Sequence, residues 1–334
     1  MTTRNLVILM ICASSIAICA NNNAAVRGPV TGYIFDAQAH AIRPMMGIPG
    51  AAYLGSPVVS NVDSASVSPD GSAAFAIQAG KLVVYTGLAS ASPTAVYLHG
   101  SIPADRFAWA PGATAAAIYS SKSTQAQIVS NLPGTLSASA PIDLSALSGQ
   151  VEALAFDGQQ IILAVTAGGS GGVYTLTEQS GPLRIASASS PSAIAFAGAD
   201  LYFADQQTEQ IWQVQSYAQQ PAPVLFASDA SISSPVALQL SADSKRLYVA
   251  NAGNRALAVY DVAARSQVES IGLTFTPSRL DRFGNASVFL LNTVGQGQAP
   301  LYVLSDADAA KPAVYFVPAP NDANSLHPIR RRPD

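Results

Sequence analysis

The amino-acid sequence predicts an all-β fold made of six similar repeats. Short apolar runs alternate with polar residues and are broken by turn residues every six to ten positions, which is typical of antiparallel strands. An apolar–any–apolar motif followed by a small or polar turn recurs, and its third residue is Val67, Trp109, Phe156, Phe196, Leu240 and Arg282. The steps between these residues are 42, 47, 40, 44 and 42. A repeat of about 40–45 residues is the length of one four-stranded blade of a β-propeller.

The stretch from Pro235 to Val262 shows the repeat most clearly. Val236, Leu238 and Leu240 lie on one side of a first strand, and a turn, a second strand, a polar turn and a third strand follow. The second strands of the six repeats are predicted at Ala73–Gln78, Ala115–Ser120, Ile161–Thr166, Leu201–Gln206, Leu247–Ala252 and Val288–Thr293. Third strands are predicted at Lys81–Tyr85, Gln127–Ser130, Gly172–Leu176, Gln210–Val214, Ala256–Tyr260 and Pro300–Ser305. Shorter outer strands are predicted at Ala95–Leu98, Ile142–Leu144, Leu183–Ala186, Val224–Ala227, Val268–Ile271 and Ala313–Val317.

Two further runs precede these repeats. Val30–Phe35 and Ala41–Gly47 resemble a third and a fourth strand that have no first and second strand before them. They could form a reduced seventh blade or cover the closure of a six-bladed ring. Because blades of this length pack readily in sevens, we expect seven blades, with six as the alternative. The propeller is predicted over residues 30–318, and residues 319–334 are predicted to form a disordered tail.

The N-terminus predicts export. Arg4 precedes an apolar run from Leu6 to Ala20, and small residues then offer a cleavage site, so residues 1–20 are interpreted as a signal peptide and residues 21–29 as a linker. The two cysteines, Cys12 and Cys19, both lie in this segment. A lipid anchor on Cys19 is a weaker alternative, because Ile18 stands where a small residue is preferred, and an uncleaved anchor is the other. We therefore expect a periplasmic or extracellular protein without cysteine.

Two repeats resemble known propeller families. Leu247 to Asn251 with Ala256 to Asp261 resembles the YVTN-type repeat, and Leu201 to Asp205 with Gln210 to Val214 resembles the related NHL-type repeat. The resemblance implies a WD40-like propeller of the exported bacterial type. Such folds are used by binding proteins, scaffolds, lactonases and quinoprotein enzymes. Fold resemblance does not choose among these functions.

Composition limits the choice of partner. Charged residues make up 11% of the chain and the formal net charge is −3, whereas a nucleic-acid partner would need a clustered basic face. No apolar run beyond the N-terminus is long enough to span a membrane. We therefore expect no nucleic acid, no membrane span after signal cleavage, and a monomer.

No motif of an enzyme stands out. Gly168 to Gly172 matches G-x-S-x-G, but a strand rather than a helix is predicted to follow, so a hairpin turn is the preferred interpretation. His40, His99 and His327 have no metal-ligand spacing, and His40 and His99 are expected near outer strands. No calcium-binding loop motif is present, although calcium held by Asp and carbonyl oxygens stays open. No catalytic residue, metal ligand or cofactor is therefore predicted.

The candidate site is a polar sector of the ring. The predicted second strands carry, at their fifth residue, Ile77, Tyr119, Val165, Asp205, Asn251 and Asn292. Asp and Asn in three consecutive blades could simply bond their own turns, or they could line a ligand site opposite an apolar sector that holds Tyr119. Arg255 lies in one of these turns. Arg279 and Arg282 lie with Asp281 in an inner strand, which lines the central channel, although an internal pairing would also explain them.

These observations favour a non-enzymatic exported propeller that acts as a binding or scaffold module for a protein, peptide or glycan. The alternative is a propeller hydrolase of lactonase type, or a quinoprotein-like oxidoreductase, with a metal or cofactor in the central channel. That alternative needs converging acids and a base, and the sequence offers only Asp205, Asp281 and nearby Asn residues.

Overall fold

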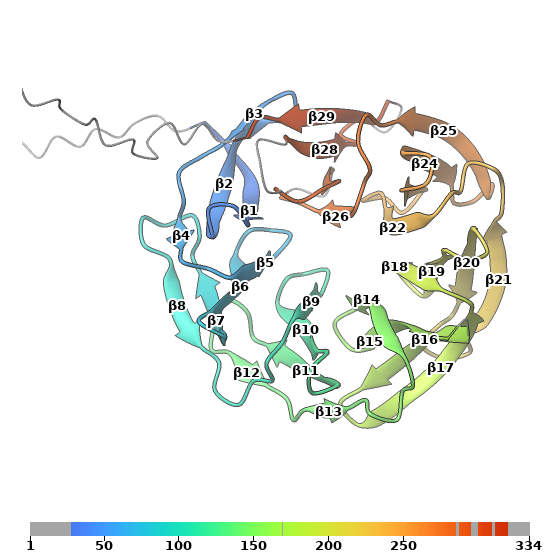
Figure 1. The fold of residues 1–334 in the computed structure, drawn as a ribbon, viewed down its shortest axis with the longest axis horizontal. Coiled ribbons are helices and arrows are strands. Elements are labelled where there is room, and N and C mark those ends of the chain that lie inside the picture. Colours follow the sequence, from blue (N-terminus) through green and yellow to red (C-terminus); the bar gives the residue numbers. More distant parts are fainter. Residues whose placement is uncertain (1–27, 169, 285–286, 295–299, 309–310, 320–334) are drawn as a thin grey trace, which may run out of the picture.

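Seven antiparallel sheets stand in a ring around a central axis in the computed structural model (Figure 1). The structure describes residues 28–168, 170–284, 287–294, 300–308 and 311–319. The predicted all-β propeller is confirmed, and so is the preference for seven blades over six. We number the blades 1 to 7 in chain order.

Each blade is one continuous stretch of chain. Blade 1 holds β1 (Val30–Asp36), β2 (Ala41–Ile48), β3 (Ala51–Leu54) and β4 (Val59–Ser60). Blade 2 holds β5 (Ser64–Val67), β6 (Ala73–Gln78), β7 (Lys81–Thr86) and β8 (Thr94–Tyr97). Blade 3 holds β9 (Arg106–Trp109), β10 (Ala115–Ser120), β11 (Gln125–Ser130), β12 (Ser137–Ala138) and β13 (Ile142–Asp143). Blade 4 holds β14 (Gln150–Phe156), β15 (Ile161–Ala167), β16 (Ser170–Thr177) and β17 (Ser180–Ala188).

Each of the last three blades has four strands in consecutive order, as blades 2 and 4 do. Blade 5 holds β18 (Pro191–Ala197), β19 (Asp200–Asp205), β20 (Gln210–Gln215) and β21 (Ala222–Ala227). Blade 6 holds β22 (Pro235–Leu240), β23 (Arg246–Asn251), β24 (Ala256–Asp261) and β25 (Ser266–Gly272). Blade 7 holds β26 (Asp281–Arg282), β27 (Val288–Leu290), β28 (Leu301–Ser305) and β29 (Ala313–Val317). In blades 2 to 7 the first strand lies nearest the central axis of the ring.

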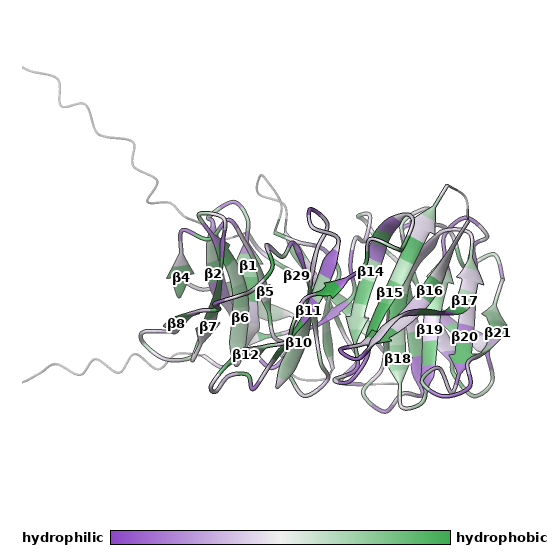
Figure 2. Ribbon diagram, turned by 90° about the horizontal axis from the view of Figure 1, so that it is seen from below, coloured by the Kyte–Doolittle hydropathy of each residue, from purple (hydrophilic) through white to green (hydrophobic). Residues whose placement is uncertain are grey.

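The core lies between the blades. Both faces of the middle strands are apolar, so each sheet buries one face against the blade before it and the other against the blade after it. One such cluster joins Tyr202 and Phe226 of blade 5 to Leu240 and Tyr260 of blade 6. In the side view, apolar residues run along the strands and polar residues gather in the loops of both faces (Figure 2).

Trp109 and Phe156 occupy equivalent positions in neighbouring inner strands, as predicted. Trp109 pairs with Ala116 and Phe156 with Ile161, each near the start of the second strand. Phe156 is fully buried, which confirms the expectation for that residue. Trp109 is half-buried: its ring lies 4.8 Å from that of Phe75 in blade 2, and its Nε1 donates to Ser66 Oγ at 2.9 Å. Trp109 therefore joins two blades without being enclosed.

The strand assignment in blade 1 was wrong. The Asp36 end of β1 pairs in parallel with Val294, which follows the second strand of blade 7, and the Thr31 end lies against the turn at Gly284 that precedes that strand. Strand β1 therefore runs in the direction of a second strand, and β2 takes the place of a third. Strands β3 and β4 both pair with β2 and together take the place of the fourth. Among the described residues, no first strand precedes β1, so β1 is the innermost strand of this blade.

Loops of blade 7 close the ring over β1. Phe283 is buried against Gly32, where an added Cβ would lie 2.8 Å from the Phe283 ring. An apolar cluster joins Ile34 and Met45 of blade 1 to blade 7 residues that include Phe283, Val294 and Val303. The ring is therefore sealed by side-chain packing and one β-bridge.

Other predictions fall outside the described residues. These are the signal peptide with Cys12 and Cys19, the tail 320–334 with His327, and the glycine-rich stretch 295–299. Within the described part of the chain, no helix has the length and hydropathy to cross a membrane.

Candidate functional site

One face of the ring carries the turns that link second to third strands, together with the crossovers that enter the next blade; we call it the mouth face. Asp205 ends the second strand of blade 5 on this face and is 2% exposed. Its carboxylate accepts the backbone N–H groups of Ser189 (2.6 Å) and Ser190 (3.1 Å) in the crossover. It also accepts those of Gln207 (3.1 Å) and Thr208 (3.4 Å) in the following turn. Asp205 thus holds two mouth-face loops together.

Asn251 bonds the crossover in blade 6, although it does not bond the turn that follows it. It is fully buried, and its Oδ1 accepts the Ser233 N–H of the crossover at 3.0 Å. Its Nδ2 donates to the carbonyl of Val249 at 3.2 Å. In blade 7, Asn292 is half-buried and bonds the backbone of Pro300 and Tyr302, on either side of the third strand's start. All three predicted polar residues therefore bond backbone groups, but only Asp205 accepts the N–H groups of its own turn as an Asx turn would.

Asp36 and Ser120 belong to the same set, and the sequence interpretation missed them. Asp36 is paired with Ala41 across a four-residue turn, just as Asp205 is paired with Gln210. Its Oδ1 accepts the N–H groups of Gln38 and Ala39. Ser120 stands opposite Gln125 in the same way, so it, and not Tyr119, is the blade 3 residue in this register. Asp36 and Asp205 each stand five residues before the start of a third strand, and this shared spacing is the sequence signal that could have identified Asp36.

Tyr119, Arg279 and Arg282 do not belong to this set of residues. Tyr119 is 5% exposed in the apolar cluster between blades 3 and 4, where burial raises the pKa of its hydroxyl. Arg279 forms an ion pair with Asp281, and both are partly exposed. Arg282 donates to the carbonyl of Leu240 in blade 6 at 2.7 Å, and its guanidinium lies over the Phe289 ring. Burial lowers the pKa of Arg282.

Two further residues are placed by turn geometry. Arg255 is exposed at the fourth position of the turn after Asn251, with a φ of 52°. His40 occupies the same position after Asp36 on the mouth face, with a φ of 48°, and its carbonyl accepts the Val62 N–H just after the outer strand β4, so it lies near an outer strand as expected. A strand follows the G-x-S-x-G match, as predicted, but β16 already begins at Ser170, two residues before the predicted start at Gly172.

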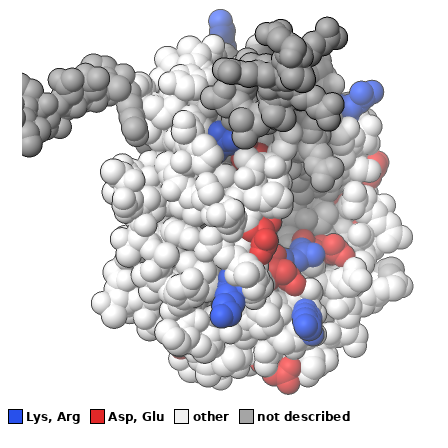
Figure 3. Space-filling view, turned by 60° about the vertical axis from the view of Figure 1, so that its left-hand side comes forward, with Lys and Arg blue, Asp and Glu red and all other residues white. Residues whose placement is uncertain are grey.

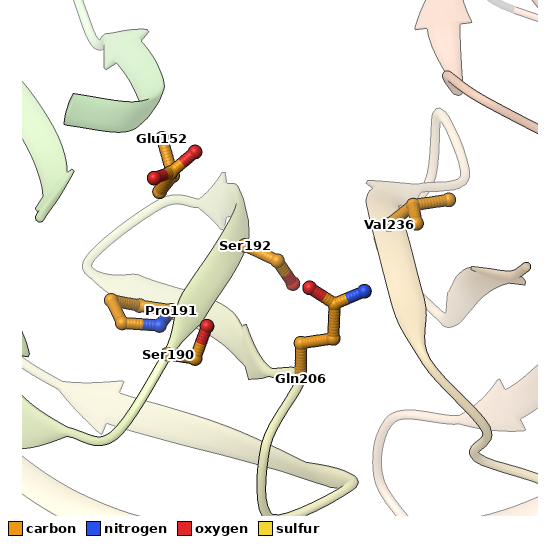
Figure 4. A pocket seen from close by; sticks show the side chains of 6 residues that line it. All are labelled: Glu152, Ser190, Pro191, Ser192, Gln206 and Val236. Atoms are coloured by element: carbon orange, nitrogen blue, oxygen red, sulfur yellow. The ribbon is translucent and has the colours of Figure 1, made fainter. Parts of the chain in front are cut away.

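A pocket of about 260 Å³ opens on the mouth face where blades 4, 5 and 6 meet, and we call it the mouth pocket. It is lined by Glu152, Ser190, Pro191, Ser192, Gln206 and Val236. Ser192 and Gln206 approach each other from strand β18 and from the turn after β19, with Glu152 and Val236 on either side (Figure 4). The side chains offer two hydroxyls, an amide and a carboxylate beside an apolar wall.

Two of the predicted polar residues, Asp205 and Asn251, hold the backbone segments that line this pocket. Asp205 accepts the backbone N–H of Ser190 and lies directly before Gln206, so it holds both lining residues in place. Asn251 is paired with Pro235, the neighbour of Val236. Ser192 Oγ donates to the carbonyl of Pro235 at 2.6 Å and joins blades 5 and 6 at the pocket floor. Glu152 and Gln206 are exposed, so their polar ends are available to a ligand.

Charge is sparse on the surface. In one space-filling view most of the described surface is uncharged, and a few acidic side chains gather beside a basic one near the centre (Figure 3). Within the described residues, no group of three or more His, Cys, Asp or Glu side chains is arranged to hold a metal ion.

The comparisons with known proteins agree on the fold. No protein-family model and no curated protein matches the chain. Among solved structures, a protein from Lactobacillus plantarum is similar at a TM-score of 0.61 and 15% identity, over 86% of this chain and 96% of that one. A candidate 6-phosphogluconolactonase from Bacteroides fragilis is similar at a TM-score of 0.60 and 12% identity, over 86% and 92%.

A third similar structure comes from a binding complex. A chain in the crystal structure of a nidogen/laminin complex is similar at a TM-score of 0.50 and 12% identity, over 72% of this chain and 93% of that one. At these identities the likeness concerns the propeller fold. The same architecture serves a candidate enzyme and a member of a protein complex, so function must be argued from the site.

Proposed function

We propose that this chain is an exported, non-enzymatic β-propeller that binds a protein, peptide or glycan at its mouth face. The observation that carries the proposal is the mouth pocket, whose lining loops are held by a buried carboxylate with four backbone partners. Such rigid support is what a recognition site needs, because little ordering is then left for the moment of binding. We place the repeats with the YVTN and NHL types on the residues of blades 5 and 6.

The lining favours a neutral, hydrogen-bonding group. The Ser190 hydroxyl and the Gln206 amide can both donate and accept, and the Glu152 carboxylate accepts when ionised. Val236 and Pro191 add an apolar wall, so one face of the bound group can be apolar. A sugar ring, or an amide side chain of a partner protein, has this combination. A volume of about 260 Å³ admits a single such group rather than a whole chain.

The alternative is a lactonase-type hydrolase or a quinoprotein-like oxidoreductase. It is favoured by one observation, the fold-level similarity to the candidate 6-phosphogluconolactonase. Lactone hydrolysis by the purified protein, or a visible absorption band, would support it over the binding function.

Capture experiments on the exported protein test the proposal. A glycan array and a pull-down from the cell envelope identify the ligand, and calorimetry then compares variants. Gln206→Ala and Glu152→Gln should each weaken the affinity about fivefold or more, which corresponds to the loss of one hydrogen bond. Because both side chains are exposed, the free energy of unfolding should change by no more than about 0.5 kcal/mol.

Matched controls lie on the other face. Gln159 and Glu178 are exposed in turns between first and second, and between third and fourth strands, of blade 4. Gln159→Ala and Glu178→Gln should leave the affinity unchanged. If the pocket and control variants bind equally well, the mouth pocket is not the site.

A further inference from the structure

Blade 2 carries a second candidate site at its outer edge, separate from the mouth pocket. We propose that a short extended peptide with an acidic side chain binds there, pairing with the free end of strand β7 beside Lys81. The site is a groove of about 550 Å³ lined by residues that include Lys81, Leu82, Tyr97, Leu98, His99 and Ile102, and we call it the rim groove.

The groove exists because the outer strand of blade 2 stops early. Strand β8 pairs with β7 only from Val83 to Thr86, so Lys81 and Leu82 have a partner strand on the β6 side alone. In blade 6, by contrast, β25 pairs with β24 along its whole length, from Ala256 to Asp261. After Tyr97 the chain of blade 2 leaves the sheet, and the place opposite Leu82 and Lys81 is left without a strand. An unpaired strand edge of this kind is a template for pairing with another chain.

A buried glutamine keeps the groove open. Gln127 of blade 3 is 1% exposed, and its Oε1 accepts the Ile102 N–H at 3.1 Å. Its Nε2 donates to the carbonyls of Gly100 at 3.2 Å and Ser139 at 2.7 Å. The segment after Tyr97 is therefore tied to blade 3 and forms the far wall of the groove, away from the β7 edge. The site is thus formed before any ligand arrives.

The lining combines an apolar floor with basic groups. Leu82 and Ile102 are buried in the cluster between blades 2 and 3, and they form the apolar part. Lys81 and His99 are exposed, and Tyr97 is 60% exposed. Among the described residues, none of the side chains of Lys81, Tyr97 and His99 has a hydrogen-bond or ion-pair partner. In a chain with only 11% charged residues, an unpaired lysine beside a histidine favours a carboxylate as ligand.

The register predicts the order of the peptide's residues. Strand β8 runs antiparallel to β7, with Tyr97 opposite Val83. A peptide that continues in this direction places its next residue opposite Leu82 and the following one opposite Lys81. Opposed residues share a face of the sheet, so the first should be apolar and the second acidic. The predicted ligand is therefore an extended segment with an apolar residue immediately before an acidic one.

A defined peptide tests this. The probe is the acetylated, amidated peptide VETS, titrated into the full protein while the methyl signals of Leu82 and Ile102 are followed by NMR. We expect saturable shifts of both signals, and about threefold weaker binding when the probe is VQTS, as one opposite-charge cross-strand pair accounts for. Lys81→Ala should weaken the binding of VETS by about the same factor and should make the two peptides equal.

The chain supplies a matched control. Lys122 is also exposed, in the corresponding turn of blade 3, so Lys122→Ala removes the same charge away from the groove. It should leave the binding of VETS unchanged. Absence of methyl shifts at millimolar VETS would overturn the proposal, and so would equal binding of VETS and VQTS by the unmodified protein. Equal effects of Lys81→Ala and Lys122→Ala would show a nonspecific charge effect and would also overturn it. Failure here leaves the mouth pocket untouched, because its variants lie in blades 4 and 5.

Discussion

Arg43 Nε lies 2.8 Å from Asp36 Oδ2, and both side chains are almost completely buried in blade 1. The partner of this carboxylate differs from that in blade 5, where Asp205 accepts two N–H groups from a crossover. No crossover leads into an inner strand of blade 1 among the described residues, and Arg43 supplies the positive partner instead. Arg43 also donates to the carbonyl of Gly55 at 3.1 Å and so holds the break between β3 and β4.

Breaking this pair should be costly. Arg43→Met leaves the Asp36 carboxylate buried beside an apolar side chain, so the free energy of unfolding should fall by about 3–5 kcal/mol. Asp36→Asn in addition removes the unpaired charge and keeps the oxygen that accepts the Gln38 and Ala39 N–H groups. The double variant should therefore be more stable than Arg43→Met alone. Denaturant unfolding of the two single variants and the double variant measures this, and purely additive losses would contradict it.

Removal of the Asp205 carboxylate should lower the stability of the fold, and it should affect binding only through the two loops that the carboxylate holds. Asp205→Ala leaves backbone N–H groups of two loops without their acceptor, so we expect a loss of about 3 kcal/mol in unfolding free energy. Asp243→Ala is the control, since that carboxylate is exposed and caps only its own turn; its loss should be clearly smaller. Chemical denaturation distinguishes them. Equal losses would mean that Asp205 does not join the crossover to the turn.

The seal between blades 1 and 7 can be tested at Gly32. An added Cβ would lie 2.8 Å from the buried Phe283 ring, so Gly32→Ala should cost about 1–3 kcal/mol. Gly272→Ala in blade 6 meets nothing within 4 Å and should be nearly neutral. Thermal unfolding of the two variants compares them. If Gly32→Ala has the stability of Gly272→Ala, Phe283 does not seal the ring in this way.

Protonation of the Asp306 carboxyl should stabilise the folded state. This carboxyl is 7% exposed between blades 6 and 7, and burial raises its pKa despite a hydrogen bond from Tyr248 and the charge of Arg282. A raised pKa means that the folded state binds the proton more tightly than the unfolded state. The contribution of Asp306 is then greatest below its ordinary value of 3.8 and is lost as pH rises through the folded-state pKa. The stability of the unmodified protein relative to Asp306→Asn should therefore increase on acidification, as unfolding curves over a pH series would show; a decrease would contradict it.

Trp109→Ala should cost about 3 kcal/mol, at the lower end for a large aromatic residue because the ring is half-buried. The fully buried Phe156 is the internal comparison, and Phe156→Ala should cost more. Trp109→Phe keeps a ring in contact with Phe75 and loses the bond to Ser66, so it should be the mildest of the three. Urea denaturation ranks them, and the reverse order of the two alanine variants would mean that Trp109 is the more enclosed side chain.

The regular repeats of the fold could be predicted from the sequence, whereas the irregular blade 1 and the mouth pocket could not. The spacing of Trp109, Phe156 and Phe196 follows the inner strands, so blade length and blade number could be predicted from it. The direction of β1 could not be predicted, because no first strand precedes it that would identify β1 as a second strand. Asp205 and Asn251 were identified from a repeated turn. The mouth pocket was missed because Glu152 and Gln206 come from different blades, and only the ring curvature brings them together.

Because β1 runs in the direction of a second strand, the first described strand begins on one face of the ring and the last described strand ends on the other. Val30 lies at the face of the first-to-second-strand turns, near Gly284, whereas Val317, paired with Leu301, lies at the mouth face. A linker or surface tether joined ahead of Gly28 would therefore hold the disc with the mouth pocket directed outward. A fusion joined after Val317 would instead stand on the same side as the pocket and compete for access to it. Display or immobilisation of this protein should use the N-terminal side.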